Sequence, residues 1–193
     1  MQQFPETRLR IIGNADVNRT GDFVLYWMTA FRRVDWNFSF QRAVDWAREL
    51  HKPLIVLEAL RCDYPWASDR LHKFIIEGMR NNQARLGDVR ATYFPYLEKE
   101  PGAGKGLLRA LAENACVVVG DDFPCFFLPK MIQSARRQIP VRFELIDSNG
   151  IWPMRATDRV FARAFDFRRF LQKNLTDHDD FPRPHPLQGA ALE

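Results

Sequence analysis

The run Phe23-Val24-Leu25-Tyr26-Trp27-Met28 decides the fold that this sequence predicts. All six side chains are apolar or aromatic, without alternating polar residues, which is typical of a strand buried on both faces of a parallel sheet. A second run of this kind, CVVVG, occupies residues 116–120. Because the central strands of such a sheet are covered on both faces, we expect these two runs to be neighbours at its centre.

Helical stretches alternate with further strands around these two runs. Strands are expected at residues 53–60, 89–97 and 141–146, and helices at residues 38–50, 69–87, 106–115 and 129–139. Such alternation produces βαβ units, whose right-handed crossovers build a parallel sheet. The sequence therefore predicts an α/β fold with a doubly wound, Rossmann-like sheet of five parallel strands in the order 3-2-1-4-5. Helices cover both faces, and a C-terminal helix and a linker follow.

The chain divides into four expected segments. Residues 1–21 mix charge with glycine and asparagine and form an N-terminal arm, in which residues 8–12 could pair locally. Residues 22–153 carry the α/β domain, and residues 154–175 a connecting helix. Residues 176–193 are acidic and then rich in proline, which is typical of a linker, and the last four resemble a vector-derived scar. A chain that ends in a linker suggests a larger parent protein.

The connecting segment contains an unusually apolar stretch, for which we expect a helix over Arg159–Leu175. Its apolar residues wrap more of the helix than one stripe facing a core requires; they are Val160, Phe161, Ala164, Phe165, Phe167, Phe170 and Leu171. We therefore expect the surplus phenylalanines to pack against another domain or a second copy of the chain, unless the helix folds back onto its own domain.

Composition and charge narrow the class of protein. The formal net charge is +4, well short of the dense basic stripe of a protein that binds nucleic acid by charge alone. No apolar run is long enough for a membrane-spanning helix, and the N-terminal residues lack the apolar region of a signal peptide. The three cysteines are widely spaced, without a CxxC pair, and are expected to be reduced thiols. These features predict a cytoplasmic protein.

The sequence contains no self-sufficient active site. The glycine-rich segment 101–106 lacks the Walker spacing, so we expect a strand-to-helix loop, with a weak anion site as the alternative. Asp177-His178-Asp179-Asp180 with His185 is expected to be solvated linker rather than a metal site. No catalytic triad, GxSxG elbow or HExxH motif is present. We therefore predict neither catalytic nor metal-binding residues.

A ligand crevice is expected where the strand order reverses. In a doubly wound sheet this crevice lies outside the carboxyl ends of the two central strands, which carry Trp27 and Met28 on one side and Gly120 and Asp121 on the other. An indole can stack on a flat ring, and a carboxylate can accept hydrogen bonds from ring N–H groups. The alternative is that Trp27 belongs only to the core.

An ordered series of short segments resembles the photolyase/cryptochrome family, most closely the N-terminal α/β domain of class II DNA photolyases. The similar positions are Val24–Met28, Arg33, Asn37, the helix pattern Arg70-x-x-x-Phe74-x-x-x-Gly78, the strand end Gly120-Asp121, and Ile151–Met154. Trp36 and Phe38 depart from the family's Asp and Trp beside the asparagine, and Gly120 replaces a threonine. The resemblance covers about residues 22–175.

The resemblance implies an antenna-type domain of a parent that repairs pyrimidine dimers in DNA with light, a deoxyribodipyrimidine photo-lyase. In the family a helical domain holds FAD and damaged DNA; we expect that domain to be missing here and the fragment itself not to be catalytic. The α/β domain often harbours an antenna chromophore such as a deazaflavin or a folate. Its expected crevice comprises Trp27, Met28, Arg33, Asn37, Gly120 and Asp121. The alternative is a cryptochrome-like photoreceptor or a stand-alone α/β module that binds a nucleotide or a partner.

Overall fold

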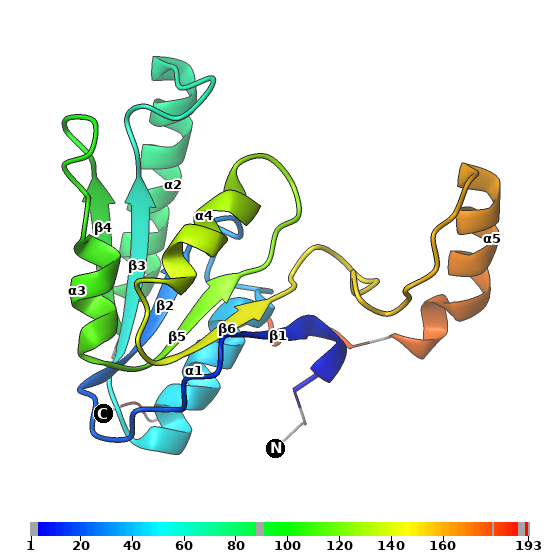
Figure 1. Ribbon diagram of the computed structural model, residues 1–193, viewed down its shortest axis with the longest axis horizontal. Helices are drawn as coiled ribbons and strands as arrows, with labels where there is room; N and C mark the ends of the chain where they lie inside the picture. Colours follow the sequence, from blue (N-terminus) through cyan, green and yellow to red (C-terminus); the bar gives the residue numbers. More distant parts are fainter. Residues whose placement is uncertain (1–3, 88–90, 179, 189–191, 193) are drawn as a thin grey trace.

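A six-stranded sheet forms the centre of the computed structural model, which describes residues 4–87, 91–178, 180–188 and 192 (Figure 1). In chain order the strands are β1 Leu9–Ile12, β2 Phe23–Met28, β3 Leu54–Leu60, β4 Ala91–Leu97, β5 Ala115–Asp121 and β6 Arg142–Ile146. Their order across the sheet is β1-β6-β5-β2-β3-β4. The predicted start of β4 at Val89 lies outside the described residues.

The prediction of a pure five-stranded parallel sheet is wrong, because β1 adds a sixth strand that runs antiparallel to β6. The order of the whole sheet therefore differs from the predicted one. Among the five parallel strands, however, β2 pairs with both β3 and β5, while β4 and β6 lie further out, as expected. β1 is held by the buried Arg8, whose guanidinium donates to the carbonyls of Asp147, Gly150 and Ile151.

Helices cover both faces of the sheet (Figure 1). They are α1 Phe38–Leu50, α2 Asp69–Leu86, α3 Leu107–Glu113, α4 Leu128–Arg136 and α5 Ala164–Asn174, with short 3-10 turns η1 Glu6–Arg8 and η2 Leu175–Asp177. Asn37 caps α1 by accepting from the backbone N–H groups of Ser39 and Phe40. Ser68 caps α2 in the same way.

The central strand β2 contributes to two separate cores. Val24, Tyr26 and Met28 face the core beneath α1. Leu25 and Trp27 point the opposite way, into the core beneath α3 and α4. This follows from the two-residue period of a strand, which sends successive side chains to opposite faces. The fully apolar sequence of β2 is thus explained by burial on both sides.

The predicted helix over Arg159–Leu175 is too long at its start. The structure begins α5 at Ala164, after an extended Arg163. Before this point Phe161 folds back onto the helix, with its ring centroid 5.2 Å from that of Phe167 and 5.0 Å from that of Phe170. This packing needs an extended backbone rather than another helical turn. α5 lies apart from the sheet (Figure 1).

Part of the predicted solvated linker is anchored to the domain. The backbone N–H of Arg183 donates to Gln41 Oε1 (2.7 Å), and its guanidinium pairs with Asp45. Pro184 accepts from the backbone N–H of Trp36, and Leu187 packs on the core beneath α1. Composition alone does not predict these contacts, because they depend on partners far away in the chain.

Candidate ligand-binding cavity

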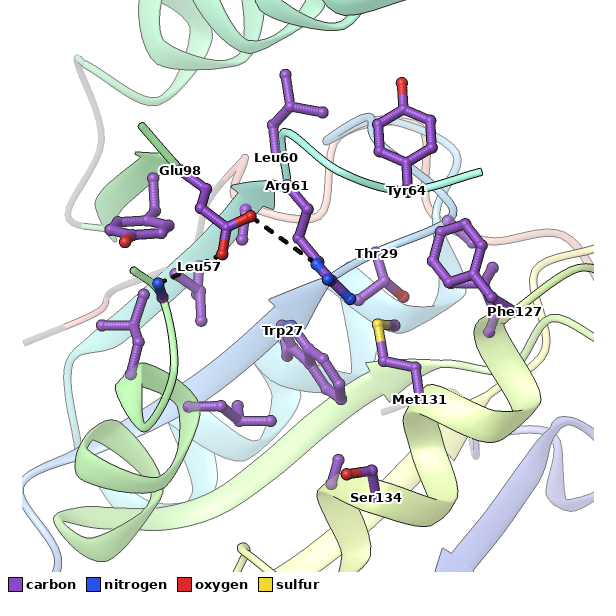
Figure 2. Close-up of a pocket in the computed structure, with 18 of the residues that line it drawn as sticks. Trp27, Thr29, Leu57, Leu60, Arg61, Tyr64, Glu98, Phe127, Met131 and Ser134 are labelled. Carbon is purple, nitrogen blue, oxygen red and sulfur yellow. Dashed lines mark hydrogen bonds and ion pairs between the residues drawn. The ribbon is translucent and has the colours of Figure 1, made fainter. Parts of the chain in front are cut away.

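A cavity of about 670 Å³ lies at the carboxyl ends of β2, β3 and β4, between α3 and α4 (Figure 2). A volume of this size suits a small-molecule ligand. Its walls are largely aliphatic and aromatic; they include Leu57, Leu60, Tyr64, Tyr96, Leu107, Leu108, Phe123, Phe126, Phe127, Leu128 and Met131. An apolar ligand surface would therefore be removed from water here.

Trp27 forms the floor of this cavity. Its side chain points to the α3 and α4 face of β2 and is only 7% exposed. The neighbouring residue on β5 is Gly120, where a Cβ would lie 3.1 Å from Leu145 and 3.2 Å from Phe143. Glycine therefore leaves room for Phe143, whose ring centroid is 6.4 Å from that of Trp27. The indole is held by packing, and only a small part of its surface is left to line the cavity.

The residues that line the cavity include Thr29 and Ser134, each with an aliphatic hydroxyl group (Figure 2). Thr29 follows the end of β2, and Ser134 lies on α4. Neither side-chain oxygen has a hydrogen-bond partner within the part of the chain that the structure describes. A buried polar group of a ligand would need such partners, because burying it without a hydrogen bond is costly.

The glycine-rich segment is a strand-to-helix loop, as expected, and it forms one wall of the cavity. Glu98 Oε1 accepts from the backbone N–H groups of Gly102 (3.0 Å) and Gly104 (3.4 Å), and its Oε2 from that of Cys62 (3.2 Å). Burial alone would raise the pKa of Glu98, but these hydrogen bonds outweigh it and lower the pKa. Since Glu98 already takes these N–H groups, they do not form an anion site. Arg61 Nε lies 3.9 Å from Glu98 Oε2 (Figure 2).

On the opposite face of the sheet, three buried side chains form what we call the polar knot: Tyr26, Asn37 and Asp121. The Asp121 carboxylate accepts from the Tyr26 hydroxyl (2.8 Å) and from the backbone N–H groups of residues 29, 30 and 31 (2.8, 2.8 and 3.0 Å). Asn37 Nδ2 donates to the Tyr26 oxygen (3.0 Å). Burial, and then the charge of Asp121, raise the pKa of Tyr26. Every member of the polar knot is therefore engaged within the protein.

The six residues of the predicted crevice are not brought together. Trp27 lines the cavity, and Gly120 lies beside it on β5. Met28, Asn37 and Asp121 are buried beyond the other face of the sheet. Arg33 is exposed and donates to the backbone oxygen of Trp36. Consecutive strand residues cannot share one face, which separates Trp27 from Met28 and Gly120 from Asp121. That a ligand contacts these six residues stays a prediction.

Sequence reasoning missed the wall that α4 contributes. Leu128, Met131 and Ser134 on α4, and Gln138 just after its end, recur at helical spacing and all line the cavity. A serine and a glutamine within an otherwise apolar stripe were the available signal, because a helix that only fills a core carries apolar residues at those positions. The hydroxyl of Thr29 had no comparable signal.

The described residues were also searched for metal-binding groups and for membrane-spanning helices. Among them, no group of three or more His, Cys, Asp or Glu side chains is arranged to hold a metal ion; Asp179 of the acidic tail lies outside this set. Likewise, none of the described helices has the length and apolar character required to cross a bilayer.

Comparison with known proteins finds sequence similarity over most of this chain. No family model matches the chain. A curated deoxyribodipyrimidine photo-lyase from Methanothermobacter thermautotrophicus is 27% identical to it over 169 residues. The matched region covers 87% of this chain but only 37% of the length of that protein. The match agrees with the resemblance seen in the sequence, while the closeness to class II stays a prediction.

Proposed function

We propose that this chain is the N-terminal α/β domain of a member of the photolyase family and binds a planar antenna chromophore in the cavity above Trp27. The observation that carries the proposal is the cavity itself: about 670 Å³ of largely apolar space at the carboxyl edge of the sheet. Ligands of doubly wound sheets bind at this edge. The chromophore would be a deazaflavin or a folate.

The residues present fit such a group. Trp27 offers an aromatic surface on which a flat ring can stack, and Met131 offers a polarizable thioether. Thr29 and Ser134 would supply hydrogen bonds to ring N–H groups or ring oxygens. When bound, the chromophore would absorb light and pass its excitation energy to a flavin. The apolar walls of the cavity would keep water away from the ring.

The proposal also covers activities that would need a protein longer than this chain. The photo-lyase from Methanothermobacter is more than twice the length of this chain's matched region, so repair of pyrimidine dimers, an FAD-binding helical domain and contact with damaged DNA all belong to the proposal. Under it, this domain collects light and the helical domain carries out the chemistry.

The helix α5 provides the surface for that helical domain in the proposal. None of its residues is buried: Phe165 and Phe167 are 61% and 41% exposed. Val160, in the segment before the helix, is 92% exposed. Without the helical domain, this surface would drive association of two copies of the chain. The double variant Val160→Ser, Phe165→Ser should then give a smaller mass by light scattering. Equal monomeric masses for both proteins would remove this part of the proposal.

The binding proposal is tested by titrating the purified chain into a fluorescent 5-deazaflavin, and separately into 5,10-methenyltetrahydrofolate, while following fluorescence anisotropy. We expect saturable binding of one chromophore per chain. Trp27→Phe should weaken it about fivefold, because the smaller ring loses part of the stacking interaction. The control Trp36→Phe, at an exposed site outside the cavity, should bind like the unsubstituted chain. Binding of neither chromophore, with binding of ATP or GMP instead, would favour the nucleotide-binding alternative.

A further inference from the structure

Two large aromatic residues near the cavity have an unfavourable backbone conformation and are also exposed. Trp66 has φ +68° and Phe126 has φ +61°, both in the left-handed region that favours glycine. Their side chains are 74% and 72% exposed. Neither the backbone strain nor the exposure of the rings is explained by core packing. Strain of this kind is characteristic of functional positions.

These residues connect two loops that flank the cavity. The loop after β3 carries Tyr64 and Trp66, and the loop after β5 carries Phe123, Phe126 and Phe127. The Trp66 and Phe126 rings meet edge to face, with centroids 6.3 Å apart. Tyr64 and Phe127 make a second contact between the loops, with their ring centroids 6.2 Å apart. Aromatic rings thus join the two loops at these two points.

The cavity side of this contact is a parallel pair of rings. The planes of Phe123 and Phe126 differ by 3°, and their centroids are 6.5 Å apart, towards the long end of the range for aromatic pairs. Both residues line the cavity, whereas Trp66 packs against the outer ring, Phe126. A flat ring that enters the cavity from this side therefore meets aromatic faces and edges before it reaches Trp27.

We propose that Trp66, Phe123 and Phe126 form an aromatic clamp that holds the planar ring of the cavity's ligand and slows its release. The inference rests on the proposed chromophore site and adds the residues that control exchange. A purely structural contact would be better served by glycine at the two left-handed positions, since glycine adopts this φ without strain. A role in holding a ligand would account for large rings at these two positions.

The test is the rate at which a bound 5-deazaflavin leaves the chain, measured by stopped-flow fluorescence after dilution. Trp66→Gly and Phe126→Gly should each release it about fivefold faster, because an aromatic contact is lost. Trp66→Tyr keeps an aromatic ring and should stay within about twofold. The matched control is Trp36→Gly, since Trp36 is also an exposed tryptophan with positive φ (+48°) but, unlike Trp66, makes no ring contact with a cavity-lining residue in the described part of the chain. Its release rate should not change.

Thermal unfolding of the ligand-free variants gives an independent reading. Relief of backbone strain should leave the Tm of Trp66→Gly and Phe126→Gly unchanged or raise it by about 2 °C. A Tm lowered by more than about 4 °C would show that the rings hold the fold, and would overturn the clamp. Unchanged release rates in a chain that still binds the chromophore would also overturn it while sparing the proposed function. If the unsubstituted chain binds no chromophore, both proposals fail.

Discussion

The two faces of the sheet use its carboxyl edge in opposite ways. On the α1 face, the polar knot of Tyr26, Asn37 and Asp121 is buried, and its polar groups pair with one another and with nearby backbone. On the α3 and α4 face, the edge is left open as a largely apolar cavity, whose lining hydroxyls include those of Thr29 and Ser134, without hydrogen-bond partners among the described residues. A polar residue at a strand end therefore indicates a ligand site only if its hydrogen bonds remain free. The following substitutions test this division.

The largest effect is expected from Asp121→Ala in the polar knot. This change leaves the Tyr26 hydroxyl and three backbone N–H groups without their acceptor, and should lower the free energy of unfolding by about 4 kcal/mol. Urea denaturation measures the loss. The comparison is Asp63→Ala, whose carboxylate forms an exposed pair with Arg61 beside the cavity and should cost less than about 1 kcal/mol. Equal losses of unfolding free energy for the two variants would contradict the difference that we describe between the two faces.

A second network on the α1 face, around Glu144, should make the stability of the protein depend on pH. Burial would raise the pKa of Glu144, but hydrogen bonds from Arg42, Trp46 and Arg142 outweigh it and lower the pKa below its ordinary value of 4.5. Its stabilisation is therefore present above about pH 4.5 and is lost as the pH falls through the lower, folded-state pKa. Glu144→Gln should cost about 2 kcal/mol at pH 7.

The measurement is urea denaturation of Glu144→Gln and the unsubstituted chain at pH 7 and pH 3. The unsubstituted chain loses the stabilisation from Glu144 in acid. The difference between the two proteins in free energy of unfolding should therefore be smaller at pH 3 than at pH 7. Glu113→Gln, at an exposed i,i+4 pair with Arg109, should show no such narrowing. A difference that stays constant with pH would mean that Glu144 does not titrate in this range.

The smallest effect is expected on the cavity side. Ser134→Ala removes a hydroxyl that has no partner in the described structure, so the Tm should change by less than about 2 °C. Chromophore binding should weaken by about fivefold if this hydroxyl bonds the ligand. The matched variant is Ser68→Ala, which removes the cap of α2 and should lower stability while leaving binding unchanged. If Ser134→Ala lowered stability without affecting binding, and Ser68→Ala weakened binding without affecting stability, the roles that we assign to the two serines would be reversed.

The sequence predicts the elements of the parallel sheet well because their signals are local. The apolar run of β2 and the Asn37 cap of α1 each depend on adjacent residues. The edge strand β1 was predicted only as a local pairing, since its place beside β6 depends on long-range contacts of Arg8. The start of α5 was wrong because Phe161 packs back on the helix.

The site was harder to predict than the fold. The carboxyl edge was located correctly, and Trp27 does line the cavity. Which strand-end residues reach it depends on the alternation of side chains and on hydrogen bonds made far along the chain. Asp121 looks like a ligand-binding carboxylate in the sequence, yet residues 29–31 and Tyr26 occupy it. The polar wall from α4 becomes evident only when that helix is placed over the sheet.

The central claim is that the ligand binds on the α3 and α4 face, above Trp27, and not at the polar knot. A crystal structure of the chain grown with a 5-deazaflavin tests it most directly. Our account predicts electron density for the ring system between Trp27 and α4, within hydrogen-bond distance of Thr29 or Ser134, with the Asp121 hydrogen bonds unchanged. Density against Arg33, Asn37 or Asp121 on the α1 face would contradict it.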